Sequence, residues 1–487
     1  MYRQPSKRKV LLQRIVVYSL MTVTVIGLVV VLVYVMLGYQ FNADDGKIEQ
    51  GGLVQFDSRP SGADISLDGN AFGTRTAAKT TMSSGQHYVV MTKDGYRQWQ
   101  KSINVVPGSV LWLNYARLVP SELTPQPVVD FSSVTSSAVS PDSKFMAVIE
   151  DGGQGKLKLS DLSRDDAKTT EVTFPAGVAT TPAEGKGQHF EITSWDPDSR
   201  YVLVKHTYND DQFEWLVIDT QDVPRSKNLT TLLDVQASVV RFSNGDSQIL
   251  YAQINGDVRK VNLRDATLSR PLITNVATFD LYSDNIVTYS SNVDSATNKR
   301  SVGYYIDGAD APHVVRTIDD TTSLLQFTVG RYYSETYEAI ALGDTIEVLK
   351  GDLPRDPQAK LDLKAEATFQ IPGGAQYLND NTDGRFIVAQ NGATYATYDL
   401  ELNKKSITTL KGSSDVTRQL HWLDGYHVWS DRDGQLRMYE FDGENEQDIM
   451  PVLTNQSASL SPSGKYMYGI TKSDNGTYHL TRVQMLL

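Results

Sequence analysis

The sequence predicts a mainly β protein that follows a single N-terminal transmembrane helix, and three observations support this fold class. Residues 15–37 form an uncharged apolar stretch, IVVYSLMTVTVIGLVVVLVYVML. After residue 40 no long helical pattern occurs, and strand-like alternation prevails in a chain with 25 tyrosines. The last 360 residues repeat a unit of a turn followed by strands, about every 46 residues. We therefore expect a small β-sandwich and then a β-propeller of eight blades, with seven as the alternative.

The apolar stretch from Ile15 to Leu37 has the length and composition of a membrane-spanning helix. At about 1.5 Å of rise per residue, these residues cross a hydrocarbon core of roughly 30 Å with some tilt. A buried core helix would show a polar stripe, and this stretch has none. The residues before it include five bases and no acid, namely Arg3, Lys7, Arg8, Lys9 and Arg14. We expect residues 1–14 to stay in the cytoplasm and everything after the helix to be exported.

An uncleaved signal anchor is the favoured form of this helix, with a cleaved signal peptide as the alternative. The apolar run is longer than the usual core of a signal peptide, and no A-x-A-like cleavage site follows it. The predicted location is therefore the cytoplasmic membrane, crossed once, with the N-terminus inside. Residues 15–37 would contact the lipid bilayer.

Charge and cysteine content exclude some classes of function. The whole chain has a formal charge of −12. The part of the chain after the helix contains 41 basic and 58 acidic residues. Because the part of the chain after the helix is this acidic, it would repel nucleic acid, and we expect no nucleic-acid partner. The absence of cysteine excludes disulfides, thiolate metal sites and a lipid-modified cysteine anchor.

Residues 38–50 are polar and short, and we interpret them as a spacer. The β-sandwich is predicted at residues 51–119, where short alternating strands are separated by turn residues. Pro60 and Gly62 break the first strand, and Asp68-Gly69-Asn70 is typical of a hairpin turn. Further strands are expected at His87 to Thr92, Gln98 to Val106 and Ser109 to Leu118.

This segment resembles the PEGA domain, a small β-sandwich module of bacterial and archaeal surface proteins. The residues that carry the resemblance are Pro60-Ser61-Gly62-Ala63, Ile65-Ser66-Leu67-Asp68-Gly69, Gly73-Thr74, Gly85, His87 and Lys93-Asp94-Gly95-Tyr96. One departure is Ala77 after Thr76, where the family often has proline. The resemblance implies the sandwich fold and an accessory role without catalytic residues.

A proline-rich linker is predicted at residues 120–127, and the propeller at residues 128–487. Its clearest repeats begin at Ser140, Asp196 and Ser461, and each reads as a polar turn, a basic residue, an aromatic residue and an apolar strand. Looser copies occur near Ser243, Ser283, Gly330, Asn381 and Asp424. A further strand is expected after each copy, at 156–162, 214–219, 258–263, 302–306, 345–349, 394–400, 435–441 and 478–485.

Eight copies predict eight blades, because one antiparallel sheet cannot bury both of its faces and neighbouring blades cover them. The last copy ends after three strands, so its fourth strand is expected from Val128 to Phe131, which would close the ring. The Ser-Pro-Asp-Ser-Lys-aromatic signature resembles those of TolB-like and WD-repeat-like propellers. In those families such residues build blade turns.

Candidate chemical groups are few. His421 and His427 could suggest a metal, but a spacing of six places no ligand set on one face. Asn379 to Gly384 matches the first half of a calcium loop, yet its twelfth position is Gln390 where a bidentate glutamate is needed. We interpret this segment, like Asp431 to Gly434, as a blade turn.

Aromatic residues and glycosylation sequons give two weaker candidates. Trp99, Trp112 and Tyr115 could form a sugar-stacking platform, but in a small sandwich such residues usually fill the core. Asn228 and Asn475 each begin an Asn-x-Thr sequon, a pattern that arises often by chance.

The favoured function is a non-enzymatic, membrane-anchored binding or scaffolding protein of the cell envelope that recognises a protein or a wall glycan. An envelope hydrolase or lyase that uses carboxylates in the propeller axis is one alternative, and a structural stalk or surface-layer component is another. No G-x-S-x-G nucleophile motif is present. No catalytic, metal or cofactor-binding residue is assigned, and no cofactor is expected.

Overall fold

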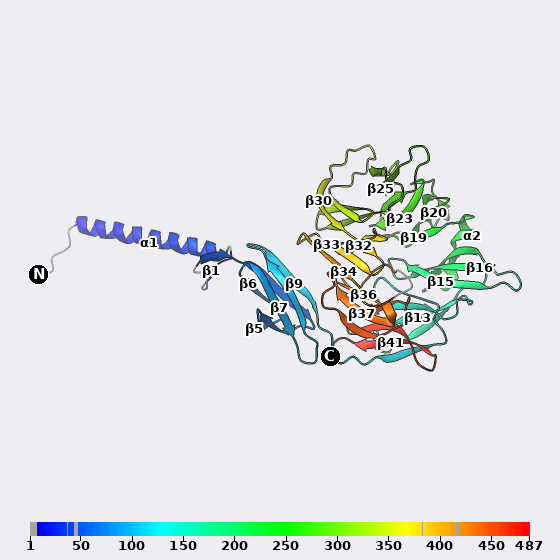
Figure 1. Ribbon diagram of the computed structural model, residues 1–487, viewed down its shortest axis with the longest axis horizontal. Coiled ribbons are helices and arrows are strands. Elements are labelled where there is room, and N and C mark those ends of the chain that lie inside the picture. The colour runs from blue at the N-terminus through cyan, green and yellow to red at the C-terminus, as the bar shows by residue number, and fades with distance from the viewer. Residues whose placement is uncertain (1–6, 37, 43–46, 284, 382, 414–417) are drawn as a thin grey trace. The chain divides into compact units, whose positions relative to one another are not determined.

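The computed structural model describes residues 7–36, 38–42, 47–283, 285–381, 383–413 and 418–487. It divides into two compact units, one of residues Met1–Glu122 and one of residues Leu123–Met485, and each is described by itself. Figure 1 colours the first unit blue to cyan and the second teal to red.

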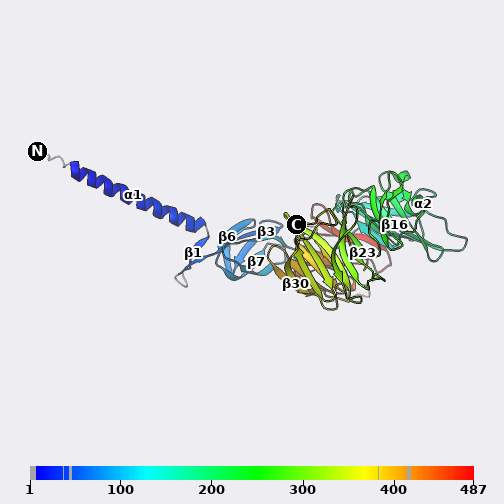
Figure 2. The same ribbon diagram turned by 90° about the horizontal axis from the view of Figure 1, so that it is seen from above.

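The chain begins with one long apolar helix, α1 (Lys7–Met36), drawn as a single uninterrupted helix in Figure 2. Its segment Val10–Met36 is long and apolar enough to cross a membrane, and its side chains are exposed. The helix begins eight residues before Ile15, and Leu37 lies outside the described residues. The predicted spacer holds a β-hairpin of β1 (Tyr39–Asn42) and β2 (Lys47–Gln50).

The sandwich consists of two sheets. The first has the order β6-β3-β9 and the second β5-β4-β7-β8. Their strands are β3 (Gly52–Arg59), β4 (Asp64–Leu67), β5 (Asn70–Arg75), β6 (Ala78–Met82), β7 (Gly85–Thr92), β8 (Trp99–Val105) and β9 (Val110–Arg117). The inward residues of both sheets form one core around Val54, Phe56, Val89 and Trp99. The predicted hairpin is confirmed, with Asn70 paired to Leu67 and Gly69 at φ 82°.

Both ends of the predicted linker belong to the domains that they connect. Pro120 pairs with Tyr96 of the sandwich, and the Ser121 N–H donates to the Gly95 carbonyl. At the other end, β10 (Gln126–Phe131) already belongs to the propeller.

The second unit is built of eight four-stranded antiparallel sheets, which confirms the eight-bladed prediction. Blade 1 holds β11 (Ser136–Val139), β12 (Phe145–Ile149), β13 (Lys156–Asp161) and β14 (Thr169–Thr173); blade 2 β15 (Gln188–Trp195), β16 (Tyr201–Tyr208), β17 (Gln212–Asp219) and β18 (Lys227–Asn228). Blade 3 holds β19 (Val239–Phe242), β20 (Ile249–Ile254), β21 (Asp257–Asn262) and β22 (Thr267–Leu268); blade 4 β23 (Val276–Tyr282), β24 (Ile286–Ser291), β25 (Arg300–Ile306) and β26 (His313–Ile318).

Blade 5 holds β27 (Leu325–Tyr332), β28 (Glu335–Leu342), β29 (Thr345–Lys350) and β30 (Lys364–Gln370); blade 6 β31 (Tyr377–Asp380), β32 (Phe386–Asn391), β33 (Thr394–Asp399) and β34 (Lys404–Thr409). Blade 7 holds β35 (His421–Trp422), β36 (His427–Ser430), β37 (Gln435–Glu440) and β38 (Gln447–Pro451); blade 8 β39 (Ala458–Leu460), β40 (Tyr466–Lys472) and β41 (Tyr478–Gln484) together with β10. Short helical turns follow β17 (η1, Val223–Arg225), β18 (α2, Leu229–Leu233) and β36 (η2, Arg432–Gly434).

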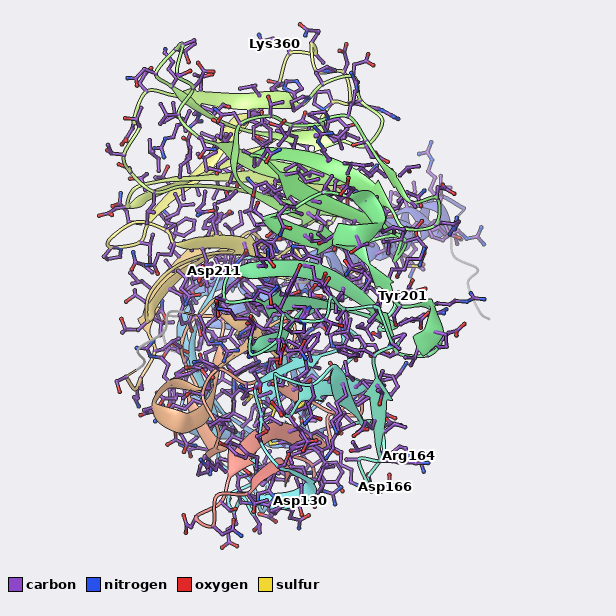
Figure 3. All side chains as sticks on the ribbon, turned by 90° about the vertical axis from the view of Figure 1, so that its right-hand side faces the viewer. Asp130, Arg164, Asp166, Tyr201, Asp211 and Lys360 are labelled. Atoms are coloured by element: carbon purple, nitrogen blue, oxygen red, sulfur yellow. The ribbon has the colours of Figure 1, made fainter. Side chains whose placement is uncertain are left out.

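The ring closes through a strand from the start of the domain, as predicted. β10 pairs antiparallel with β41, and Asp130 lies opposite His479. Their side chains also meet, with His479 Nδ1 at 2.7 Å from Asp130 Oδ1. In Figure 3 Asp130 of blade 8 and Lys360, from the loop after β29 of blade 5, lie at opposite ends of the view.

The repeat signature builds the turn between the first two strands of a blade. In the copies that begin at Ser140, Asp196, Asn381 and Ser461, the side-chain oxygen of the first residue accepts the backbone N–H five residues later, at 2.9, 2.6, 2.8 and 3.1 Å. The fourth residue has a positive φ, between 57° and 70°. The sequence identifies these turns because few residue types satisfy both requirements. Near Gly330 the prediction is displaced, because Gly330 to Tyr332 still belong to β27. In two of the looser copies, Asp284 and Thr382 lie outside the described residues.

Hydrophobic cores lie between adjacent blades. One cluster joins blades 1 and 2 through Ile149 and Phe190, another joins blades 5 and 6 through Ile346 and Ile387, and a third joins blades 8 and 1 through Tyr468 and Met146. Each blade thus covers its neighbour, which is why the repeat is stable only as a ring.

Candidate functional site: the axial channel

The first strands of the blades surround an axial channel. Along these strands apolar residues alternate with more exposed polar ones, as in β23, where Phe279 is buried while Thr278 and Asp280 are exposed. A strand directs successive side chains to opposite faces. Apolar residues such as Phe279 pack in the cores between blades, and polar residues such as Thr278 and Asp280 line the cavities along the axis.

Three cavities lie along this channel, of about 560, 450 and 210 Å³. The 450 Å³ cavity touches blades 1, 2, 7 and 8 and is lined largely by hydroxyl groups and indole rings, including those of Ser137, Thr193, Ser459, Trp422 and Trp429. The 210 Å³ cavity touches blades 3 to 7 and is lined by Gln326, Gln376, Asn379 and Gln419 among others. Most of these groups are neutral hydrogen-bonding groups.

Charged residues interrupt this neutral lining at two places. Arg418, which lines the 450 Å³ cavity, forms an ion pair with Asp431. Arg241 Nη1 of blade 3 lies 3.8 Å from Asp280 Oδ1 of blade 4, and both residues line two of the cavities. Asp380, at the end of β31, lies near enough to Asp280 for their charges to repel. Removal from water, with a smaller contribution from Asp280, raises the pKa of Asp380 to about 7. The channel lining thus includes the carboxyl group of Asp280, and Asp380, whose pKa is raised, lies beside it.

A second carboxyl group with a raised pKa lies away from the axis. Glu338 of β28 is fully buried, and neither of its oxygen atoms has a hydrogen-bond partner among the described residues. Burial raises its pKa to about 7, and Arg316 opposes this only partly.

The two histidines singled out in the sequence do not share a site. His421 stacks on Trp429 at 4.8 Å and lines the channel, where burial and the charge of Arg418 lower its pKa to about 4. His427 is buried, and its Nδ1 lies 2.8 Å from Asp424 Oδ1. No metal assignment follows from this pair.

The first calcium-loop candidate is only partly the predicted blade turn, because Asn379 and Asp380 end β31 and Thr382 lies outside the described residues. The second candidate, Asp431 to Gly434, forms the turn between β36 and β37, as predicted. Asn381 caps the Phe386 N–H and donates to the Gly425 carbonyl, while Gln390 is buried and donates to the Arg418 carbonyl. In the second candidate, Asp433 accepts hydrogen bonds from Arg437, which lower the pKa of its carboxyl.

Three acidic side chains at the end of β37 and in the turn after it, Glu440, Asp442 and Glu444, place ligand atoms within 4.8 Å of one another. Exposed acidic groups of this kind are common without a cation, and this cluster alone carries no assignment.

The three aromatic residues of the sandwich do not form one platform. Trp99 is buried in the core and meets the Tyr115 ring edge-on at 6.3 Å, whereas Trp112 is 40% exposed. Of the sequon residues, Asn228 caps α2 and donates to Glu214, and Asn475 lies in the exposed turn before β41.

Sequence reasoning missed the charged residues that line the channel, Arg241, Asp280 and Arg418, and also Asp380 beside Asp280. The available signal was the alternation of polar residues in the first strand of each repeat. That signal becomes specific only when the blade order shows that these strands are innermost.

Residues 52–121 match the PEGA domain family. No curated protein matches the chain. Among solved structures, an oligogalacturonate lyase in complex with manganese is similar at 11% identity and a TM-score of 0.40, with 73% of this chain and 98% of that chain covered. The Cps50 (Swd1) β-propeller domain of Myceliophteria thermophila is similar at 11% identity and a TM-score of 0.39, with coverages of 68% and 100%.

The tricorn protease is similar at 10% identity and a TM-score of 0.41, and the alignment spans 74% of this chain but only 38% of that chain. At such identities and scores these likenesses carry no argument about activity. The chain thus combines a segment of the PEGA domain family with an eight-bladed propeller.

Proposed function

We propose that this protein is a non-enzymatic recognition protein, anchored by residues 15–37 in the cytoplasmic membrane with its N-terminus inside. The PEGA-type sandwich and the propeller are then displayed outside the cytoplasm, and the axial channel receives a segment of an envelope protein or a glycan. The observation that carries this proposal is the lining of the channel. Its hydroxyl and amide groups offer hydrogen bonds, and its two arginines, Arg241 and Arg418, are already paired with Asp280 and Asp431.

The anchor is supported by the exposed apolar side chains of α1, from Val10 to Met36. In water such a helix would expose far more contiguous apolar surface than soluble proteins do. The basic residues before it and the acidic ones after it favour an inside N-terminus.

The test uses the full-length protein, purified in detergent, as bait for native membranes and for washed wall material. Enrichment of one protein or of wall glycan supports the proposal. Thr193 lines the two larger cavities and is exposed, so Thr193→Trp should block the channel and abolish the capture. Gln370→Trp, on the exposed outermost strand of blade 5, is the matched control and should capture as the unmodified chain does. Equal capture by both variants would refute recognition by the channel.

The carboxyl pair Asp280 and Asp380 favours a second candidate function, an envelope hydrolase or lyase. With a pKa raised to about 7, Asp380 is partly protonated at neutral pH and could donate a proton, while Asp280 acts as the base. Turnover of a glycan panel that Asp380→Asn abolishes, and that declines above pH 7, would support the enzyme. A channel that binds but turns over nothing favours recognition.

A further inference from the structure

A basic cavity lies away from the axis, between the turns of blades 2 and 3. Its volume is about 570 Å³, within the range of small-molecule sites. Four of its lining residues are cationic, and none is acidic; the cations are Arg200, Arg225, Lys227 and Arg264. This is unexpected in a chain whose formal charge is −12.

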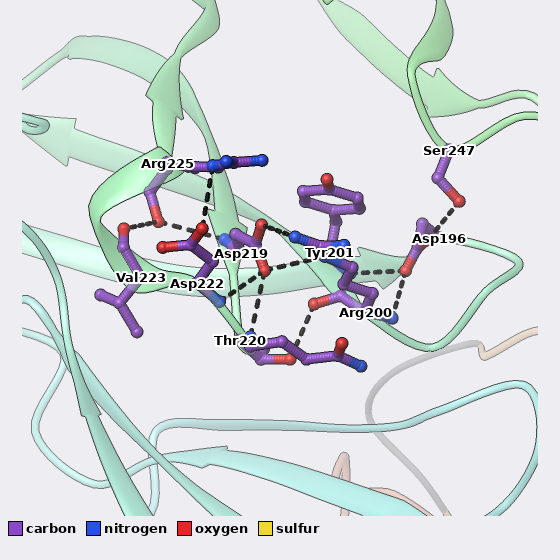
Figure 4. Close-up of polar contacts among 11 residues, drawn as sticks. Asp196, Arg200, Tyr201, Asp219, Thr220, Asp222, Val223, Arg225 and Ser247 are labelled. Atoms are coloured by element: carbon purple, nitrogen blue, oxygen red, sulfur yellow. Dashed lines mark hydrogen bonds and ion pairs between the residues drawn. The ribbon is translucent and has the colours of Figure 1, made fainter.

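Two of the four cations are already paired. Arg200 makes a bidentate contact with Asp219, with distances of 3.0 and 2.6 Å. Arg225 Nε lies 2.8 Å from Asp222 Oδ2, and Asp219 in turn accepts the Asp222 N–H, as Figure 4 shows. These pairs fix the blade 2 side of the cavity and neutralise it.

The other two cations have no carboxylate partner among the described residues. Lys227 Nζ donates to the Leu263 carbonyl, which leaves its charge uncompensated. Arg264 is exposed, and no acidic group pairs with it. The nearby Asp246 and Asp265 are engaged in their own turns, where they accept from Gln248 N–H and Asn262 Nδ2. The lining of the cavity therefore holds two cations without an ion-pair partner in the described part of the chain, and neither Asp246 nor Asp265 lines it.

The rest of the wall is apolar and aromatic. Val217, Pro224 and Leu263 line it together with Tyr201, which Figure 3 labels. The single hydroxyl of Ser247 in blade 3 lies within hydrogen-bond distance of the carboxyl groups of Asp196 and Asp198 in blade 2, so the turns on both sides are held together. A ring-sized group would fit against this wall while an oxyanion attached to it meets Lys227 and Arg264.

We propose that this cavity is a binding site for a small organic oxyanion, such as a sugar ring that carries a phosphate, sulfate or carboxylate group. The site is separate from the axial channel and does not depend on its function. A cationic site of this kind selects charged ligands that the neutral channel would not.

The test is calorimetric titration of the full-length protein in detergent with glucose 6-phosphate, glucose 6-sulfate and gluconate, and with glucose as the neutral control. We expect binding of at least one anion, weakened by added salt, and no binding of glucose. The three anions distinguish which oxyanion the cavity prefers. Failure of all three to bind at low salt would overturn the proposal, whatever the channel binds.

Two variants place the anion in this cavity. Arg264→Gln should weaken binding by about tenfold or more, because it removes a charge-assisted hydrogen bond. Arg164→Gln is its control, since Arg164 lies in the corresponding turn of blade 1, is exposed, and does not line the cavity. Gln248→Glu, which adds a negative charge to the lining while all four cations stay in place, should abolish binding. Equal affinities of Arg264→Gln and Arg164→Gln would overturn the proposal.

Discussion

At Glu338, burial rather than an ion pair sets the charge state of a carboxyl group. The side chain lies in β28 on the face toward blade 4. There its negative charge contributes to the raised pKa of Tyr304, and the positive charge of Arg316 acts to lower the pKa of Glu338. Its pKa of about 7 exceeds the ordinary 4.5 because water is excluded and no donor replaces it.

This raised pKa predicts a loss of stability with rising pH. Below pH 4.5 the group is protonated in the folded and unfolded chain alike, and between pH 4.5 and about 7 only the unfolded chain ionises readily. The free energy of unfolding should thus fall over this range by roughly 3 kcal/mol from this residue alone. In denaturant unfolding, Glu338→Gln should be more stable than the unmodified chain at pH 8, and the difference should shrink toward pH 5.

Glu335→Gln is the control for this experiment, because Glu335 begins the same strand but is half exposed beside Lys350. It should show no comparable pH dependence. A Glu338→Gln variant whose stability follows that of the unmodified chain at every pH would contradict the assignment.

At the scale of single elements, the turn between the first two strands of a blade explains the repeat. Its first residue must be Ser, Asp or Asn, since only a short acceptor side chain reaches the N–H five residues later. In two blades the basic residue that follows pairs with the end of the third strand, Arg200 with Asp219 and Arg385 with Asp399. The signature therefore ties three strands together.

Asn381 tests this role of the turn. Asn381→Ala should lower the free energy of unfolding by about 1–3 kcal/mol, because the buried Phe386 N–H and Gly425 carbonyl lose their partner. Asn381→Ser should recover part of the loss, since serine occupies this position at Ser140 and Ser461. Equal stabilities of the alanine and serine variants, measured by chemical denaturation, would show that the cap contributes nothing.

The difference between what the sequence predicts and what it does not has a physical basis. Turns and strands are set by local rules, so the hairpin at Asp68-Gly69-Asn70 and all eight third strands are where they were expected, as are the blade turns other than the one near Gly330. The channel residues Arg241, Asp280 and Asp380 come from three blades and are brought together only by the ring. The hairpin β1–β2 and the placement of Trp112 outside the core likewise depend on pairing that single strands do not reveal.

At the scale of the whole molecule, ring closure joins the two ends of the propeller sequence. β10 completes blade 8, and the buried Phe131 and Leu480 lie in the core between blades 8 and 1. This closure holds both termini of the domain in one sheet, where β10 covers the edge of β41.

Because the chain has no cysteine, a designed disulfide can test this closure. Asp130→Cys with His479→Cys should form a disulfide, since the two residues are opposite each other in antiparallel strands. The cross-linked chain should migrate faster on a non-reducing denaturing gel. Asp130→Cys with Lys472→Cys is the control, because Lys472 lies opposite Tyr478 and should leave both thiols free. A cross-link in the control alone would contradict the closure by β10.

Display of both β domains outside the cytoplasm is the central claim, and membrane-impermeant maleimide labelling of single cysteines tests it most directly. Ser121→Cys, exposed after the sandwich, should be labelled on intact cells. Ser6→Cys, in the N-terminal tail, should be labelled only after the cells are permeabilised. The reverse pattern, or protection of Ser121→Cys until permeabilisation, would contradict an inside N-terminus and an exported propeller.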